Sequence, residues 1–287
     1  MKGPRISASS YSNTAPLIWS FLYGSNHGAV EIILDNAPVR SAELLSQNRV
    51  DAALVPVIAY QQLDGVRLIA DVCVGAKEKV RSVCLVTDGR ELESVKSVSL
   101  DISSKTSACL TKIIFREFLG FEPIWKDAKP DLQAMLAESD CALLIGDPAL
   151  TVSTTSGRNA TVTERAKRLQ TKTSTAIYKT FDLAELWKKH TGFGFVFAMW
   201  MTRNETCDIN FAAARDEGLL HLNDIAANYK AEIGLSSEEM LEYLSENISY
   251  STDDSMQKGL ELYFELAAKH KLVKENKPLS FIEFARE

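Results

Sequence analysis

The chain has 287 residues, of which 46% are hydrophobic and 24% charged, and this length is sufficient for two lobes of about 100–150 residues. The 32 Lys and Arg against 38 Asp and Glu give a net charge of −6, and no basic tract points to nucleic-acid binding. No apolar run reaches the roughly 18–20 residues of a membrane helix, and no apolar leader follows the N-terminus. We therefore expect a cytoplasmic protein that binds neither nucleic acid nor membrane.

Short strand-like and helix-like segments alternate through the first half of the chain. The predicted strands are 5–9, 30–34, 52–57, 66–70 and 80–87, and the predicted helices between them are 15–23 and 41–47. Strands separated by helices of this length are typical of βαβ units and a largely parallel sheet. The sequence therefore predicts the α/β class.

A second α/β unit begins near residue 91, with predicted strands at 95–101 and 142–145. The segment 151–175, rich in Ser, Thr and basic residues, predicts a surface excursion with a short helix at 163–169. An apolar and aromatic run at 193–201 follows, and the remainder of the chain has helical periodicity. One of these helices is predicted to begin with a capping box formed by Ser236 and Glu239.

No linker or internal repeat separates the two units. We expect the chain to leave lobe 1 near Asp88, build lobe 2, and return near Trp200. Lobe 1 would then contain residues 1–88 and 200–287, and lobe 2 residues 89–199. Two connecting segments of this kind form a double-crossover hinge with a ligand cleft between the lobes.

The cysteines and histidines give no sign of a cofactor. The five cysteines lie far apart, mostly in apolar segments, which favours buried reduced thiols over disulfides. The four histidines lack the spacing of metal ligands, and neither a dinucleotide fingerprint nor a G-x-S-x-G motif is present. We therefore expect no metal and no organic cofactor.

Polar loops follow a predicted strand and open a predicted helix in each lobe. The candidate ligand-binding residues in them are Ser10, Tyr11, Asn13, Ser104, Thr106 and Ser107. Carboxyl ends of strands face the ligand crevice of an α/β sheet, and hydroxyls with helix-opening amides suit an anion. Simple N-capping is the alternative for both loops. One such loop in each lobe favours a small dianion bound between the lobes.

Two shorter segments leave their roles open. Gly146 and Asp147 follow a predicted strand, where Asp147 could bond a ligand or cap the next helix. Arg81 and Ser82 precede the strand near the hinge, where Arg81 could pair with a carboxylate or form a surface ion pair.

Several segments, taken together and in this order, resemble the chorismate dehydratase family of the futalosine route to menaquinone. They are Ser10-Tyr11-Ser12-Asn13 with Pro16-Leu17, then 51–57, 81–83, 100–107, 143–150, 182–187 and 191–200. The resemblance implies a two-lobed fold similar to type II periplasmic binding proteins. It also implies a carbon–oxygen lyase that removes water from chorismate to give 3-[(1-carboxyvinyl)oxy]benzoate, without a cofactor.

The resemblance also implies roles for particular residues. Asn13 would hydrogen-bond near the departing hydroxyl and Ser82 would hold one carboxylate, so both are expected to be catalytic. Thr106 and Ser107 would bind the other carboxylate, and the Gly146–Asp147 segment would line the same wall. This chain departs from the common S-Y-L-N pattern at Ser12, from a usual proline at Gly194, and in a longer 151–175 segment.

Two other functions fit the same fold. One is a non-catalytic cytoplasmic sensor or binding protein for small anions, and the other is the sister enzyme 1,4-dihydroxy-6-naphthoate synthase. The Ser10–Asn13 and Ser104–Ser107 segments favour the dehydratase. The sequence leaves open the oligomeric state and the proton acceptor, which is either a protein group or the substrate's own enolpyruvyl carboxylate.

Overall fold

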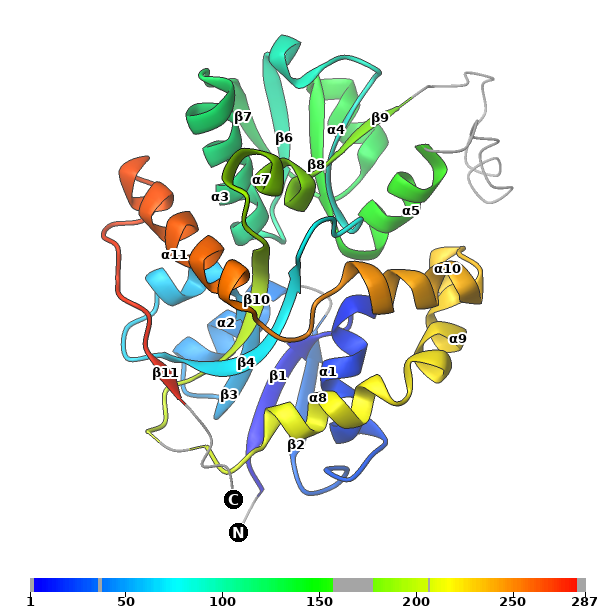
Figure 1. The fold of residues 1–287 in the computed structure, drawn as a ribbon, viewed down its shortest axis with the longest axis vertical. Helices are drawn as coiled ribbons and strands as arrows, with labels where there is room; N and C mark the ends of the chain where they lie inside the picture. Colours follow the sequence, from blue (N-terminus) through cyan, green and yellow to red (C-terminus); the bar gives the residue numbers. More distant parts are fainter. Residues whose placement is uncertain (1–2, 36–37, 157–177, 206, 283–287) are drawn as a thin grey trace.

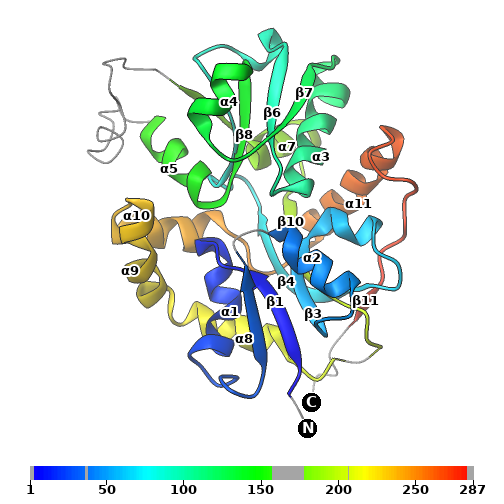
Figure 2. The same cartoon turned by 180° about the vertical axis from the view of Figure 1, so that it is seen from behind.

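The computed structural model describes residues 3–35, 38–156, 178–205 and 207–282. These residues form two β-sheets, each flanked by helices (Figures 1 and 2). The predicted helix at 163–169 and most of the predicted excursion at 151–175 lie outside the described residues, whereas 151–156 end a helix. Within the described part of the chain, no helix is both long and apolar enough to span a membrane.

The first sheet contains both ends of the described chain. Its strand order is β11-β4-β10-β3-β1-β2. The strands are β1 (Arg5–Ser9), β2 (Glu31–Asp35), β3 (Ala52–Pro56), β4 (Arg67–Ala76), β10 (Phe195–Thr202) and β11 (Phe281–Ile282). The first three pair in parallel as predicted, and β10 runs antiparallel between β3 and β4. Their helical connections are η1 (Ser12–Thr14), α1 (Ala15–Leu22), α2 (Pro38–Ser46) and η2 (Val57–Gln61).

The second sheet has the order β7-β6-β8-β5-β9. Its strands are β5 (Val83–Thr87), β6 (Ser97–Asp101), β7 (Ile124–Ala128), β8 (Cys141–Ile145) and β9 (Lys179–Asp182). Its helical segments are η3 (Leu92–Ser94), α3 (Lys105–Ile113), η4 (Ile114–Leu119), α4 (Leu132–Glu138), α5 (Gly146–Ser156) and α7 (Leu183–Thr191). Each sheet with its helices is called a lobe below.

The C-terminal helices connect the two lobes. They are α8 (Phe211–Leu219), α9 (Leu222–Ile233), α10 (Ser237–Glu242), η5 (Tyr243–Asn247) and α11 (Asp254–Lys269). Helix α8 packs on α1, whereas α11 extends to α3 of the second lobe (Figure 1). There the Tyr263 hydroxyl donates to the Thr106 carbonyl oxygen at 3.0 Å. The last helix therefore fixes the start of α3 relative to the first lobe.

The sheets place the two crossings earlier than predicted. Strand β5 pairs with β8 and β9 in the second sheet, and all of β10 pairs within the first sheet. The boundaries predicted at 88/89 and 199/200 are therefore corrected to the segments 77–82 and 192–194. Both strands are almost entirely buried and apolar, so their sequences fit either sheet equally well.

Asp182 joins the first crossing to helix α7. Its carboxylate accepts the amide protons of Val80 at 3.1 Å and Arg81 at 2.6 Å, and it also caps α7 through Ala184 at 3.0 Å. Arg81 has a φ of +62°, which a non-glycine residue adopts only where its surroundings hold it. Burial raises the pKa of Asp182, while the amide bonds from Arg81, Glu185 and Val80 act in the opposite direction.

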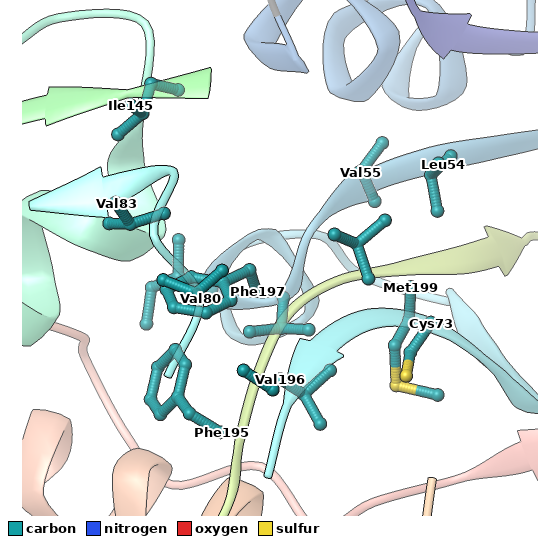
Figure 3. Close-up of a cluster of buried hydrophobic side chains, with 14 of the residues drawn as sticks. Leu54, Val55, Cys73, Val80, Val83, Ile145, Phe195, Val196, Phe197 and Met199 are labelled. Atoms are coloured by element: carbon teal, nitrogen blue, oxygen red, sulfur yellow. The ribbon is translucent and has the colours of Figure 1, made fainter. Parts of the chain in front are cut away.

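The hydrophobic core continues across the junction of the lobes. Figure 3 shows Val83 and Ile145 from the second sheet opposite Leu54 and Phe197 from the first, with Val80 of the crossing between them. The predicted reduced thiols are confirmed: all five cysteines are free, and four of the five are buried.

The predicted capping box at the start of α10 is confirmed. The Ser236 hydroxyl accepts the Glu239 amide proton at 3.1 Å, and the Glu239 carboxylate accepts the Ser236 amide proton at 2.9 Å. We expect Ser236→Ala to lower the free energy of unfolding by about 1 kcal/mol, since one opening amide loses its acceptor. Urea titration checks this value. Ser237→Ala is the control, and an equal loss in that variant would contradict the capping role.

Candidate ligand cleft

A cavity lies between the two lobes at the carboxyl ends of strands from both sheets. It encloses about 530 Å³, including its open mouth. The first lobe lines it with Ser9, Tyr11, Asn13, Thr14, Pro38, Leu54, Pro56, Val74, Phe197 and Ala198, and the second with Val83, Ser104, Thr106, Ser107, Ile145 and Gly146. None of these lining residues carries a charge. The cavity thus combines apolar surface with hydroxyl and amide groups, as small-molecule sites commonly do.

Asn13 is part of the cavity wall because β1 ends at Ser9 and the chain turns there into η1. The Thr14 hydroxyl donates to Asn13 Oδ1 at 3.3 Å, and the Ser9 and Thr14 hydroxyls lie 3.1 Å apart. The carboxamide oxygen of Asn13 therefore accepts a hydrogen bond from within η1. Its nitrogen is the group suited to donate to a ligand.

The start of α3 forms the opposite wall. Ser104 caps this helix, because its hydroxyl accepts the Ser107 amide proton at 3.2 Å. Thr106 Oγ1 accepts the Ile58 amide proton at 3.3 Å, which is a bond between the lobes. Capping and cavity lining therefore occur together in this loop. The opening amides of a helix and these hydroxyls are suitable donors for an anion.

Tyr11 packs across the cleft against Gly146. Gly146 has a φ of +64°, and a Cβ atom at this position would lie 3.1 Å from the Tyr11 ring. Burial raises the pKa of Tyr11, the nearby Asp101 and Asp147 carboxylates raise it further, and a hydrogen bond with Ser103 lowers it. This glycine therefore permits a close contact between a ring of one lobe and the backbone of the other.

Asp147 makes a second contact between the lobes. The Ser12 hydroxyl donates to Asp147 Oδ1 at 2.5 Å, and the Ser12 amide donates to the same oxygen at 3.3 Å. Ser12 stands where the common S-Y-L-N pattern has leucine, so its hydroxyl gives this chain a hydrogen bond that a leucine side chain could not make. We call the contact between Ser12 and Asp147 the Ser12–Asp147 latch.

Three predicted site residues do not line the cavity, namely Ser10, Ser82 and Asp147. Ser82 is fully buried, and its hydroxyl is 3.5 Å from the Val80 carbonyl oxygen. The Ser10 carbonyl oxygen accepts the Tyr229 hydroxyl at 3.3 Å. Arg81 Nη1 lies 3.4 Å from Asn247 Oδ1. The other predicted site residues, Tyr11, Asn13, Ser104, Thr106, Ser107 and Gly146, do meet in one cavity.

Several groups at or beside the cleft were not predicted from the sequence. Leu54 and Phe197 are buried residues within apolar strands, where no signal in the sequence separates cavity lining from core packing. Asp101 ends β6 and is 1% exposed; its Oδ1 accepts the Ser103 amide at 2.8 Å and hydroxyl at 2.6 Å. Its Oδ2 has no hydrogen-bond partner among the described residues, and burial raises its pKa. No metal-binding group of three or more His, Cys, Asp or Glu occurs in the described ranges.

Comparisons with known proteins identify the family and the fold of this chain. The Menaquinone biosynthesis family model matches residues 4–269. Chorismate dehydratase of Thermus thermophilus is 28% identical over 265 residues, covering 89% of this chain and 92% of that protein. An Archaeoglobus fulgidus crystal structure has a TM-score of 0.63 at 16% identity, covering 95% of this chain and 99% of that chain.

The fold extends to transport proteins. The periplasmic aliphatic sulphonate binding protein of Escherichia coli has a TM-score of 0.60 at 14% identity, covering 100% of this chain and 96% of that one. The two-lobed fold of type II periplasmic binding proteins, expected from the sequence, is thereby confirmed. Because the family model covers nearly the whole chain, this protein belongs to the Menaquinone biosynthesis family.

Proposed function

We propose that the chain is a chorismate dehydratase that forms 3-[(1-carboxyvinyl)oxy]benzoate. The observation that carries this proposal is the cavity between the lobes, with Asn13 on one wall and the start of α3 on the other. Membership of the menaquinone family and the relationship to the Thermus thermophilus enzyme support it. The apolar groups of the cavity suit a six-membered ring, and the hydroxyls and helix amides suit carboxylates.

The proposed reaction needs orientation and one proton acceptor. The C3–H bond breaks and its electron pair enters the ring, while the C4–O bond breaks and hydroxide leaves. The acceptor takes the C3 proton and passes it to the departing hydroxide, so that water leaves and the ring becomes aromatic. Aromatisation favours the products, so the protein mainly holds the reacting groups in the productive arrangement.

The proton acceptor in this proposal is the enolpyruvyl carboxylate of the substrate. Among the described residues that line the cavity there is no carboxylate, and the two nearby aspartates, Asp101 and Asp147, are bonded to Ser103 and Ser12. Thr106, Ser107 and the opening amides of α3 would bind the other carboxylate. Asn13 would donate a hydrogen bond from its amide nitrogen to the departing hydroxyl, which gains negative charge as the C4–O bond breaks.

Incubation of the purified chain with chorismate tests the function. We expect the substituted benzoate to appear by liquid chromatography and mass spectrometry, at a rate proportional to protein concentration. Heat-denatured protein is the control for spontaneous breakdown of chorismate. Tight binding of chorismate without product would favour a non-catalytic anion-binding protein with the same fold. The absence of binding would exclude chorismate as the ligand.

A further inference from the structure

A buried tyrosine, Tyr243, lies behind the wall of the cleft that contains Asn13. Tyr243 begins η5, its side chain is 0% exposed, and its hydroxyl oxygen has no hydrogen-bond partner among the residues that the structure describes. Burying a hydroxyl without a partner is unfavourable, and such a group in a native structure calls for a role that explains it.

Segment η5 is packed against the crossing that carries Ser82. Asn247, one helical turn beyond Tyr243, donates to the Lys79 carbonyl oxygen at 3.4 Å and accepts from Arg81 at 3.4 Å. Burial raises the pKa of the Tyr243 phenol, the Ser82 and Asn13 side chains lie near enough to lower it, and Asp147 raises it. The phenol therefore lies beside both residues that the sequence marked as catalytic.

The hydrogen bonds of these two neighbours leave room for the phenol. The Ser82 hydroxyl lies 3.5 Å from the Val80 carbonyl oxygen, which is beyond the usual range for a hydroxyl donor. Among the described residues, the Thr14 hydroxyl donates to Asn13 Oδ1 at 3.3 Å, and a carbonyl oxygen has a second lone pair. A tyrosine hydroxyl both donates and accepts, so it can serve the two neighbours at once.

We propose that Tyr243 is a positioning residue for Asn13. In the ligand-bound form its hydroxyl accepts the Ser82 proton and donates to Asn13 Oδ1. With that oxygen bonded to Thr14 and Tyr243, the Asn13 nitrogen is directed into the cleft. Ser82 then acts through Tyr243 and not by touching the substrate, which agrees with its burial outside the cavity lining. The kinetic consequence rests on the proposed dehydratase function.

Tyr243→Phe tests this proposal, because it removes one oxygen that is unpaired in the free protein. We expect an unchanged or slightly raised Tm, together with a fall in kcat of about 10-fold and little change in KM. Tyr250→Phe is the matched control, since the Tyr250 hydroxyl is also buried and without a partner among the described residues. That control should keep the kcat of the unsubstituted chain.

A second measurement separates this proposal from the proposed function. The side-chain amide resonance of Asn13, identified by its loss in Asn13→Ala, should shift in Tyr243→Phe and not in Tyr250→Phe when chorismate is added. An unmoved resonance, or an unchanged kcat in Tyr243→Phe, overturns the positioning role even if the unsubstituted chain forms product. If the unsubstituted chain forms no product, the dehydratase function fails, and the resonance alone decides the role of Tyr243.

Discussion

Asn13→Ala is expected to lower kcat for chorismate by about 100-fold, because the departing hydroxyl loses the donor that stabilises its developing charge. The amide lies at the cavity wall and its oxygen makes one bond of 3.3 Å, so its loss removes little from the folded state. We therefore expect Tm to stay within about 2 °C of the unsubstituted value. Quenched-flow assays of product formation measure kcat, and thermal unfolding measures Tm.

Comparing the effect of Asn13→Ala on chorismate affinity with its effect on kcat shows at which stage Asn13 acts. A donor that acts mainly as the C4–O bond breaks lowers kcat when removed, with only a small change in ground-state affinity. Calorimetry on Asn13→Ala should accordingly give a Kd close to the KM of the unsubstituted chain. Asn204→Ala, an exposed asparagine beyond β10, is the control for handling effects. Near-normal kcat in Asn13→Ala would exclude Asn13 from the reaction.

The sequence predicted Asn13 and the start of α3 because a local rule places them. Each follows a strand and opens a helix, and the carboxyl ends of strands in α/β sheets face the ligand crevice. Ser104, Thr106 and Ser107 were placed by the same rule, and the structure brings all three to one wall of the cavity. This reasoning needs no knowledge of how the second lobe is oriented.

Ser82 shows where the local rule ends. Successive side chains of an extended segment point to opposite sides, so Ser82 and Val83 cannot both face the cleft. Val83 lines the cavity and Ser82 is buried behind it. The side that faces the ligand depends on how β5 pairs with β8 and on the turn at Arg81, where φ is +62°. The sequence alone did not fix either.

The position of Tyr243 beside the site could not be predicted from the sequence for a different reason. It lies more than 150 residues from Ser82 in sequence, in a helical region whose apolar stripe is typical of core packing. Its approach to the crossing depends on tertiary contacts such as that of Asn247 with Lys79. The same limit explains the misplaced lobe boundaries, because β5 and β10 are apolar strands that only their partners assign to a sheet.

The Ser12–Asp147 latch is expected to set the affinity for chorismate. Its bond joins the lobes, so its loss shifts the free protein toward open forms and reduces the fraction that is competent to bind. A hydrogen bond to a charged group contributes about 1.5–3 kcal/mol, so we expect Asp147→Ala to raise Kd by about 30-fold. Measuring Kd by calorimetry in the Asn13→Ala background avoids turnover during the titration.

A double-mutant cycle distinguishes the latch from two independent effects. Ser12→Ala keeps its amide bond to Asp147, so it should raise Kd less, by about 10-fold. If the two residues act through one bond, the double variant should bind about as weakly as Asp147→Ala alone, whereas independent effects would multiply to about 300-fold. Asp127→Ala, which removes an exposed carboxylate from the same lobe, controls for net charge. Since Ser12 precedes Asn13, a coupled result would mean that closure of the lobes and placement of Asn13 depend on the same loop.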